Sequence, residues 1–322
     1  MTGPGNWVHS ASGPVGFRHP GGSVRSENLR GIVLMLLAMA ALALMDATMK
    51  ELSGHYPALQ VAALRGLLSL PFIIGWIFWR ERSFRTIIAV RWGWHLARGV
   101  MAILMLTSFI YAISSMPLSE AYTLFFVSPL LITALSVPLL GEVVGPRRWF
   151  AVVIGFAGVM IVLRPGFVAI NLATLAVLVS AVCYALNAVS VRILGRTDST
   201  AAMSFWFIMM VAIGAGLLAL PNWTPVRIED AGWLIGLGIT GALGQFLITA
   251  AFRCAPISVI APFEYSTLFW GVALDLVIWG ELPAPIVFVG AAVIVGSGLY
   301  LIQRERQLAR SALTPESGTP SQ

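Results

Sequence analysis

Six residues that can bind a polar solute or exchange a proton lie within long apolar stretches: Asp46, Arg65, Arg98, Glu264, Tyr265 and Asp275. An ionised side chain at the centre of a membrane span costs at least about 2.5–3.5 kcal/mol, so each charge needs a counter-charge or a function. Arginine binds carboxylate and phosphate groups through two parallel hydrogen bonds, and an apolar environment makes a carboxyl group hold its proton more tightly. We therefore expect Arg65 or Arg98 to bind an anionic group, and Glu264 or Asp275 to exchange protons.

A structural role is the alternative for these charges. They can form ion pairs between helices, or reach the membrane surface along their aliphatic stems. Lys50 and Glu120 lie near the ends of apolar stretches, so a structural role fits them as well as a functional one does. Aromatic residues offer a further set of possible solute contacts, although most such rings anchor helices at the membrane surface or pack between them. The candidates for such contacts are Tyr111, Tyr122, Tyr184, Trp206, Tyr265 and Trp270.

The composition indicates a protein that lies in a lipid bilayer. Of 322 residues, 58% are hydrophobic and 11% charged, whereas soluble proteins carry about 25% charged residues. The net charge of +6 would suit nucleic acid, but the basic residues come singly or in short groups between apolar runs. A nucleic-acid partner needs a continuous basic face, so we expect none.

Ten stretches are long enough to cross a bilayer, which takes about 20 apolar residues per helix. Their predicted bounds are 30–52, 59–79, 93–114, 119–141, 148–164, 171–193, 200–220, 231–251, 257–280 and 284–303. Proline and glycine mark most of the breaks. We predict an all-α polytopic membrane protein with ten transmembrane helices. The remaining residues form a disordered tail at 1–28, rich in Gly, Pro and Ser, and a second tail at 304–322.

The distribution of arginine and lysine predicts the orientation. With the N-terminus inside, fifteen basic residues fall on the inner side and three on the outer side. This bias predicts that both termini are cytoplasmic, in agreement with an even number of spans. The charges within the spans then form an outer group (Asp46, Lys50, Arg65 and Asp275, with Glu120 at the surface) and an inner pair (Arg98 and Glu264). Both groups contain both signs, which suits a zwitterionic or amphipathic solute.

An internal repeat covers almost all of the apolar sequence. The shift that pairs Trp94 with Trp233 also pairs Pro117 with Pro256, Gly141-Glu142 with Gly280-Glu281, and Pro146 with Pro285. Near the start of the repeats the shift is slightly longer, which pairs Lys50 with Arg192. Each unit, 30–165 and 171–303, holds five helices, so the second must enter the membrane upside down. Inverted repeats are typical of secondary transporters, whose solute site lies between the halves.

The repeat separates shared architecture from features of one half. The two Gly-Glu turns occur in both halves and are interpreted as architecture. In this alignment of the halves, Asp46 and Arg65 correspond to Ala188 and Phe207. Arg98, Glu264 and Asp275 correspond to Leu237, Phe125 and Ser136. Charges present in one half only are what an asymmetric solute requires, which favours a functional role for them.

The motifs and their order resemble the EamA-type members of the drug/metabolite transporter superfamily. The resemblance runs from about residue 31 to residue 303. It is carried by Asp46-Ala-Thr-Met-Lys50, Leu64-Arg65-Gly66, Pro117-Leu-Ser-Glu120-Ala with Pro129-Leu, Gly155-Phe-Ala-Gly158 with Arg164-Pro165-Gly166, Ala261-Pro-Phe-Glu264-Tyr, and the two Gly-Glu turns. The resemblance implies a carrier of small organic metabolites in a bacterial inner membrane. Members handle amino acids, S-adenosylmethionine, riboflavin and opine-type metallophores, so the cargo stays open between these types.

Other functions find little support in the sequence. Cys183 and Cys254 have no CxxC or zinc-ligand spacing, so we expect no metal and no cofactor. The chain has no HExxH, GxSxG or P-loop motif, and the connections between its spans are short, so we expect no enzyme. A channel, which needs a ring of repeated filter residues, and a non-transporting scaffold are the alternatives to a carrier.

Overall fold

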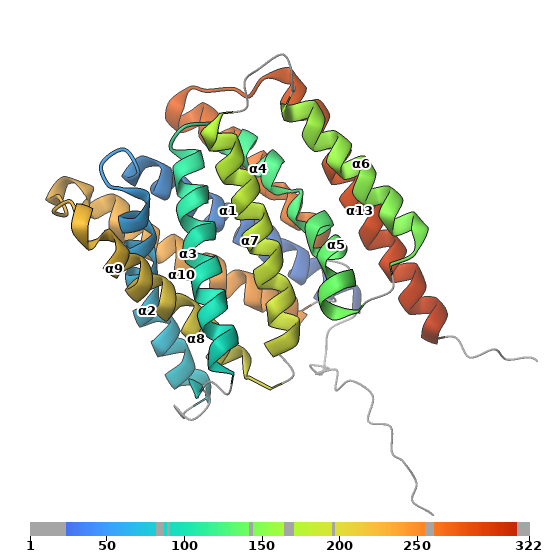
Figure 1. Ribbon diagram of the computed structural model, residues 1–322, viewed down its shortest axis with the longest axis horizontal. Coiled ribbons are helices and arrows are strands. Elements are labelled where there is room, and N and C mark those ends of the chain that lie inside the picture. The colour runs from blue at the N-terminus through green and yellow to red at the C-terminus, as the bar shows by residue number, and fades with distance from the viewer. Residues whose placement is uncertain are drawn as a thin grey trace, which may run out of the picture.

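The structure is a bundle of long helices. The computed structural model describes residues 24–81, 87–88, 91–141, 144–163, 171–194, 197–254 and 261–313, and the regular elements in these ranges are all helical (Figure 1). Seven of the described helices are long and apolar enough to cross a membrane, and two shorter apolar helices cover 149–163 and 285–300. Large apolar side chains face outward, including Trp79 at 76% exposure and Phe269 at 66%. The protein is therefore an all-α polytopic membrane protein, and its outer surface suits lipid.

The elements follow the predicted order. The first repeat contains α1 (Val24–Leu52), α2 (Ala58–Glu81), α3 (Trp92–Ile113), α4 (Leu118–Phe125), α5 (Ser128–Leu140) and α6 (Pro146–Leu163). The second contains α7 (Leu172–Leu194), α8 (Thr200–Met210), α9 (Gly216–Ala219), α10 (Ala231–Cys254), α12 (Ser266–Leu274) and α13 (Pro285–Leu313). The first helix begins before the predicted span and the last one continues beyond it. Most of the two predicted tails, together with Glu142 and Arg164-Pro165-Gly166, lies outside the described residues.

Three of the predicted spans are interrupted rather than continuous α-helix. The span 119–141 divides into α4 and α5 at Phe126-Val127. The break lies just before Pro129, because a proline ring in a continuous helix clashes with the carbonyl of the preceding turn. The span 200–220 passes through a π-helical segment, Val211–Ala215. The span 257–280, described from residue 261 on, changes from a 3-10 helix through α12 to a π-helical segment, Asp275–Trp279.

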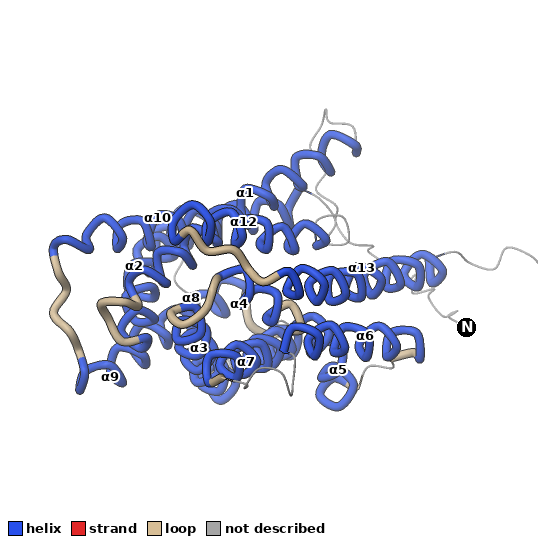
Figure 2. The backbone as a smooth tube through the Cα atoms, turned by 90° about the horizontal axis from the view of Figure 1, so that it is seen from above, coloured by secondary structure: helices blue, strands red, loops and turns tan. Residues whose placement is uncertain are grey.

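The closest helix pairs join one repeat to the other. The most extensive contacts are those of α1 with α10, α6 with α13, and α3 with α7. Figures 1 and 2 both show α6 beside α13 and α3 beside α7. The first helix of each repeat thus packs on the third helix of the other, and the two fifth helices pack together. The repeats interlock and do not form separate domains.

Glycine contacts reproduce this symmetry at the level of residues. A Cβ built on Gly99 would lie 2.8 Å from the Cβ of Met210, and one on Gly238 would lie 3.5 Å from the Cβ of Leu68. These two contacts are equivalent, because the repeat pairs Gly99 with Gly238 and Leu68 with Met210. Gly141 and Gly280 also correspond, with φ of 69° and 68°, and each ends a helix in the left-handed conformation that glycine adopts without strain.

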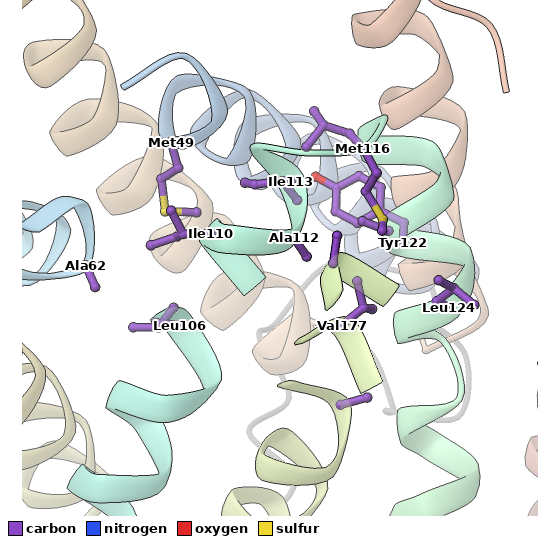
Figure 3. Close-up of a cluster of buried hydrophobic side chains, with 14 of the residues drawn as sticks. Met49, Ala62, Leu106, Ile110, Ala112, Ile113, Met116, Tyr122, Leu124 and Val177 are labelled. Atoms are coloured by element: carbon purple, nitrogen blue, oxygen red, sulfur yellow. The ribbon is translucent and has the colours of Figure 1, made fainter. Parts of the chain in front are cut away.

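The main hydrophobic core joins both repeats near the ends of α1 and α3. Figure 3 shows Met49 of α1, Ala62 of α2, Ile110 of α3 and Tyr122 of α4 among its members. Val177 of α7 brings the second repeat into the same cluster. The charged candidates of the predicted outer group are therefore held by the best-packed part of the bundle.

A carboxylate–histidine pair joins the repeats on each side of the bundle. On the predicted outer side, Asp230 accepts a hydrogen bond from Tyr56 at 2.5 Å and pairs with His55 at 2.9 Å. Burial, together with the hydrogen bond to Asp230, raises the pKa of the Tyr56 hydroxyl. On the predicted inner side, His95 at the start of α3 pairs with the buried Asp198 at 2.5 Å. Each pair links the loop after the first helix of one repeat to the start of the third helix of the other.

Candidate functional site

Asp275 is bound to the start of α4. Its carboxylate accepts hydrogen bonds from the backbone N–H groups of Leu118 and Ser119, at 2.9 and 2.8 Å, and from the Ser119 hydroxyl at 2.6 Å. Pro117, at the N-cap position of α4, makes no side-chain capping bond. Asp275 therefore caps this helix from the other repeat, where its negative charge also favours the positive end of the helix dipole.

Lys50 neutralises this buried carboxylate. Its Nζ lies 3.6 Å from Asp275 and 3.6 Å from the half-exposed Glu281, and 4.1 Å from the centre of the Trp279 ring. Asp275 is fully buried and Lys50 nearly so. Three hydrogen bonds and the ion pair with Lys50 thus hold the Asp275 carboxylate between the two repeats.

Asp46 and Arg65 form a second, more accessible group of charges. Asp46 accepts a hydrogen bond of 2.8 Å from the Tyr122 hydroxyl. Arg65 on α2 lies within electrostatic range of Asp46 and reaches the sulfur of Met49 at 3.9 Å. Both charged side chains are half-buried. Both side chains keep some accessible surface beside the main hydrophobic core.

Glu264 lies apart from these charges, among aromatic rings. Tyr184 of α7 and Tyr265 both lie within electrostatic range of its carboxylate. The side chain is half-buried and makes no hydrogen bond or ion pair within the described part of the chain. The Tyr265 ring packs edge-to-face on Phe126, with centroids 5.0 Å apart, and its hydroxyl occupies the space beside Gly298. Tyr265 therefore positions this segment as well as lying next to Glu264.

A row of aromatic rings connects the two charged regions. The ring of Tyr184 lies 5.3 Å from Phe125, Phe125 lies 5.6 Å from Phe109, and Phe109 stacks on Tyr122 at 6.3 Å with an interplanar angle of 18°. Tyr184 is near Glu264 and Tyr122 binds Asp46. The row, contributed by α3, α4 and α7, thus has a free carboxylate at one end and an acid–base pair at the other.

Arg98 occupies a different position. It is 6% exposed, on the side of α3 that faces α8, with its guanidinium carbon 5.5 Å from the centre of the Phe207 ring. Arg98 and Glu264 form no ion pair with each other in the described part of the chain, because Arg98 lies against Phe207 and Glu264 lies near Tyr184 and Tyr265. Glu264 and Asp275 do not lie on one regular helix, because the segment 261–279 changes helix type twice.

Sequence reasoning passed over several residues of this region. Phe109 and Phe125 looked like ordinary apolar residues, and Ser119 appeared only as the first residue of the predicted span 119–141. Their roles depend on neighbours from other helices, which no local pattern reveals. A surface groove of about 330 Å³ between α2 and α9, lined by apolar residues such as Leu67 and Leu217, contains none of the charged candidates. It suits contact with lipid.

Comparisons with known proteins agree with this architecture. The model of the EamA-like transporter family matches residues 29–164 and 171–303. A solved crystal structure with 20% sequence identity superposes with a TM-score of 0.60, over 88% of this chain and 100% of the other, and shows the same fold. The all-helical membrane fold and the doubled match to a transporter family define the class as an inverted-repeat transporter. The chain belongs to the EamA-like transporter family.

Curated relatives of similar length are transporters of small molecules. A riboflavin transporter of Vibrio cholerae is 30% identical over 89% of this chain and 98% of its own length. A pseudopaline exporter of Pseudomonas aeruginosa is 28% identical over 86% and 97% of the two chains. An S-adenosylmethionine uptake transporter of Rickettsia prowazekii is 25% identical over 87% and 94%. This chain is accordingly a small-metabolite transporter of the membrane.

Proposed function

We propose that this protein carries a small amphipathic metabolite with a planar ring system, of the riboflavin type, across the inner membrane by alternating access. The observation that carries the proposal is the aromatic row Tyr184–Phe125–Phe109–Tyr122. Aromatic rings attract flat conjugated solutes by stacking and edge-to-face contacts. Glu264 at one end and the Asp46–Arg65 pair at the other provide acceptors and donors for polar substituents.

The named relatives support this class of cargo. Riboflavin carries a planar three-ring system with a polar chain, and S-adenosylmethionine carries a planar purine on a zwitterionic chain. Pseudopaline, an opine-type metabolite, is the third type of cargo. A ring-lined site with charges at both ends suits the first two cargoes best, and similarity to the riboflavin transporter of Vibrio cholerae adds to the support for the first.

We propose that Glu264 couples transport to protons. A carboxylate that changes its protonation during transport must reach water and must lack a permanent counter-charge. Glu264 is half-buried with no ion pair among the described residues, whereas Asp275 is saturated by Lys50 and by the start of α4. The same proposal assigns cargo contact to Asp46, Arg65 and Tyr265, and a structural role to Asp275.

Counterflow in proteoliposomes tests the cargo class. Vesicles loaded with unlabelled riboflavin should accumulate radiolabelled riboflavin in a saturable manner, and S-adenosylmethionine and an opine should be compared as competitors. Phe125→Leu should weaken the apparent affinity roughly 2–12-fold, the loss expected for one aromatic pair. Phe269→Leu, on the exposed surface, is the matched control. Ohmic current would indicate a channel, and no counterflow with any member of the panel would overturn the proposal.

A proton gradient tests the coupling separately. Glu264→Gln should transport at the same rate with and without an imposed gradient, while wild type responds to it. An unchanged response in Glu264→Gln would remove Glu264 from the coupling step and would leave the cargo proposal intact.

A further inference from the structure

Arg98 is a buried cation that forms no ion pair within the described part of the chain. Its Nε and Nη1 are shielded from solvent and have no hydrogen-bond partner. Within the described ranges, no carboxylate forms an ion pair with Arg98, and Asp198 pairs with His95, three residues earlier on α3. The face of the Phe207 ring attracts the guanidinium from one side only. A buried charge left in this condition is costly, so a missing partner is implied.

The repeat shows where the counter-charge is missing. In the alignment of the two halves, Arg98 and Phe207 correspond to Leu237 and Arg65. We call Arg98 with Phe207 the inner corner, and Arg65 with Leu237 the outer corner. Each corner joins the third helix of one repeat to the second helix of the other, and each holds one arginine. Both corners therefore contain one cation, which comes from the third helix at the inner corner and from the second helix at the outer corner.

Among the described residues, a carboxylate accompanies the arginine at the outer corner and none does so at the inner corner. There, Arg65 interacts with Asp46 of α1. The residue that corresponds to Asp46 is Ala188 of α7, which is half-buried. The helix α7 packs closely on α3, as the hydrogen bond of 2.9 Å from Ser180 to the carbonyl of Met105 shows. A methyl group thus stands where the symmetry of the fold would place a carboxylate.

We infer that the inner corner binds a small anion, a carboxylate or a halide, on Arg98. The anion takes the part that Asp46 has at the outer corner, and the free N–H groups of Arg98 donate to it. Two sources share this chemistry: an inorganic anion that binds by itself, and the carboxylate of an anionic solute. The inference goes beyond the proposed function, because the aromatic row and its charges do not include this corner.

Thermal unfolding of the purified full-length protein in detergent tests the inference without any ring-containing cargo. Sodium chloride and, separately, sodium acetate are titrated from low salt. Saturable binding to the folded state should raise the Tm of wild type by a few degrees. Arg98→Leu, which introduces the residue found at the equivalent position of the other repeat, should lose this rise. Arg227→Gln, which changes an exposed arginine, should keep it and so corrects for general salt effects.

A second variant supplies the missing charge. Ala188→Asp should raise the Tm at low salt and abolish the response to added anions, because its carboxylate replaces the ligand. A rise with acetate only would indicate a carboxylate site, and a rise with both salts a general anion site. An equal rise in wild type and Arg98→Leu, or no rise in wild type, would overturn the inference. Riboflavin counterflow is a separate measurement, so failure of the anion site and failure of the proposed function can be told apart.

Discussion

At the scale of single residues, the buried charges divide by the partners they have. Asp275 and Lys50 neutralise each other and close the start of α4. Asp46 and Arg65 interact and are half-buried, and Glu264 lies near Tyr184 and Tyr265 with no ion pair among the described residues. Accessibility together with incomplete pairing, more than depth in the membrane, distinguishes the side chains that can exchange protein contacts for contacts with a solute.

Removing the charge of Asp275 should damage the fold rather than the coupling. Asp275→Asn places an amide N–H₂ against backbone donors and leaves Lys50 without its buried partner, so we expect a loss of about 2–4 kcal/mol in the free energy of unfolding. Thermal unfolding in detergent measures it. Ser119→Ala, which removes one of the three bonds, should cost about 1 kcal/mol. A stable Asp275→Asn protein with altered pH dependence of transport would reverse this assignment.

Tyr56 should stabilise the outer side of the bundle in a pH-dependent manner. Tyr56→Phe removes a buried bond to Asp230 and the one accepted from the backbone of Arg227, at a cost of about 1–3 kcal/mol. Because the pKa is raised in the folded protein, this stabilisation is complete below the unfolded value of about 10 and is lost as the pH rises through the folded value. Wild type should therefore lose thermal stability above pH 10 more steeply than Tyr56→Phe.

At the scale of elements, close backbone contacts fix the crossing of α2 with the helix α8–α9. A Cβ at Gly66 would lie 2.8 Å from the Cα and the N of Ala212, within the π-helical segment. Backbone atoms cannot move aside as a flexible side chain can. The π-helical segment packs on α2 together with α8 and α9, and it contains the backbone contact with Gly66.

A pair of glycine substitutions on the same helix tests this contact. Gly66→Ala should destabilise the protein by about 1–3 kcal/mol through overpacking and slow transport. Gly75→Ala, where a Cβ would meet nothing within 4 Å, should be neutral or stabilise by up to about 1 kcal/mol. Thermal unfolding and counterflow of the two variants provide the comparison. Equal behaviour of both variants would show that the crossing tolerates a wider spacing.

The helices and their repeat were readable from the sequence, but most contacts of the site were not. Apolar length and glycine or proline breaks set the spans, and the constant offset identified the second repeat before any contact was known. Asp275 was expected to act on a solute or a proton. Its actual partners, Leu118 and Ser119, lie far away in the sequence, so no local pattern reveals them. The helix changes near Phe126 and Val211 also depend on packing partners from distant parts of the chain.

The asymmetry of the charges takes a different meaning in three dimensions. By residue number, Arg65 and Arg98 have no counterparts in the other half. By position, they occupy equivalent corners of the bundle, and the difference lies in the anion: Asp46 at one corner and Ala188 at the other. Sequence comparison alone aligns residues with residues, so it cannot show that a charge has moved to the neighbouring helix.

At the scale of the whole molecule, the charge bias predicts which way the protein faces. We propose that both termini are cytoplasmic, as the fifteen-to-three distribution of basic residues indicates. A fluorescent protein fused at the C-terminus should fluoresce in cells. A cysteine at Ser53, in the loop between α1 and α2, should react with a membrane-impermeant reagent added outside, and one at Thr197 should not. If the reagent labels only the Thr197→Cys variant, the protein has the opposite orientation in the membrane.

The exchange of helix partners between repeats has a consequence for biogenesis. Synthesis delivers α1 to the membrane long before α10, the helix on which it packs most extensively, and α6 must wait for α13 at the end of the chain. Each early helix therefore spends part of translation with its contact surface turned towards lipid or towards the insertion machinery. A chain that stops after the first repeat would keep those surfaces permanently unpartnered and become a substrate for proteolysis. The same chain expressed together with the missing second repeat should be rescued.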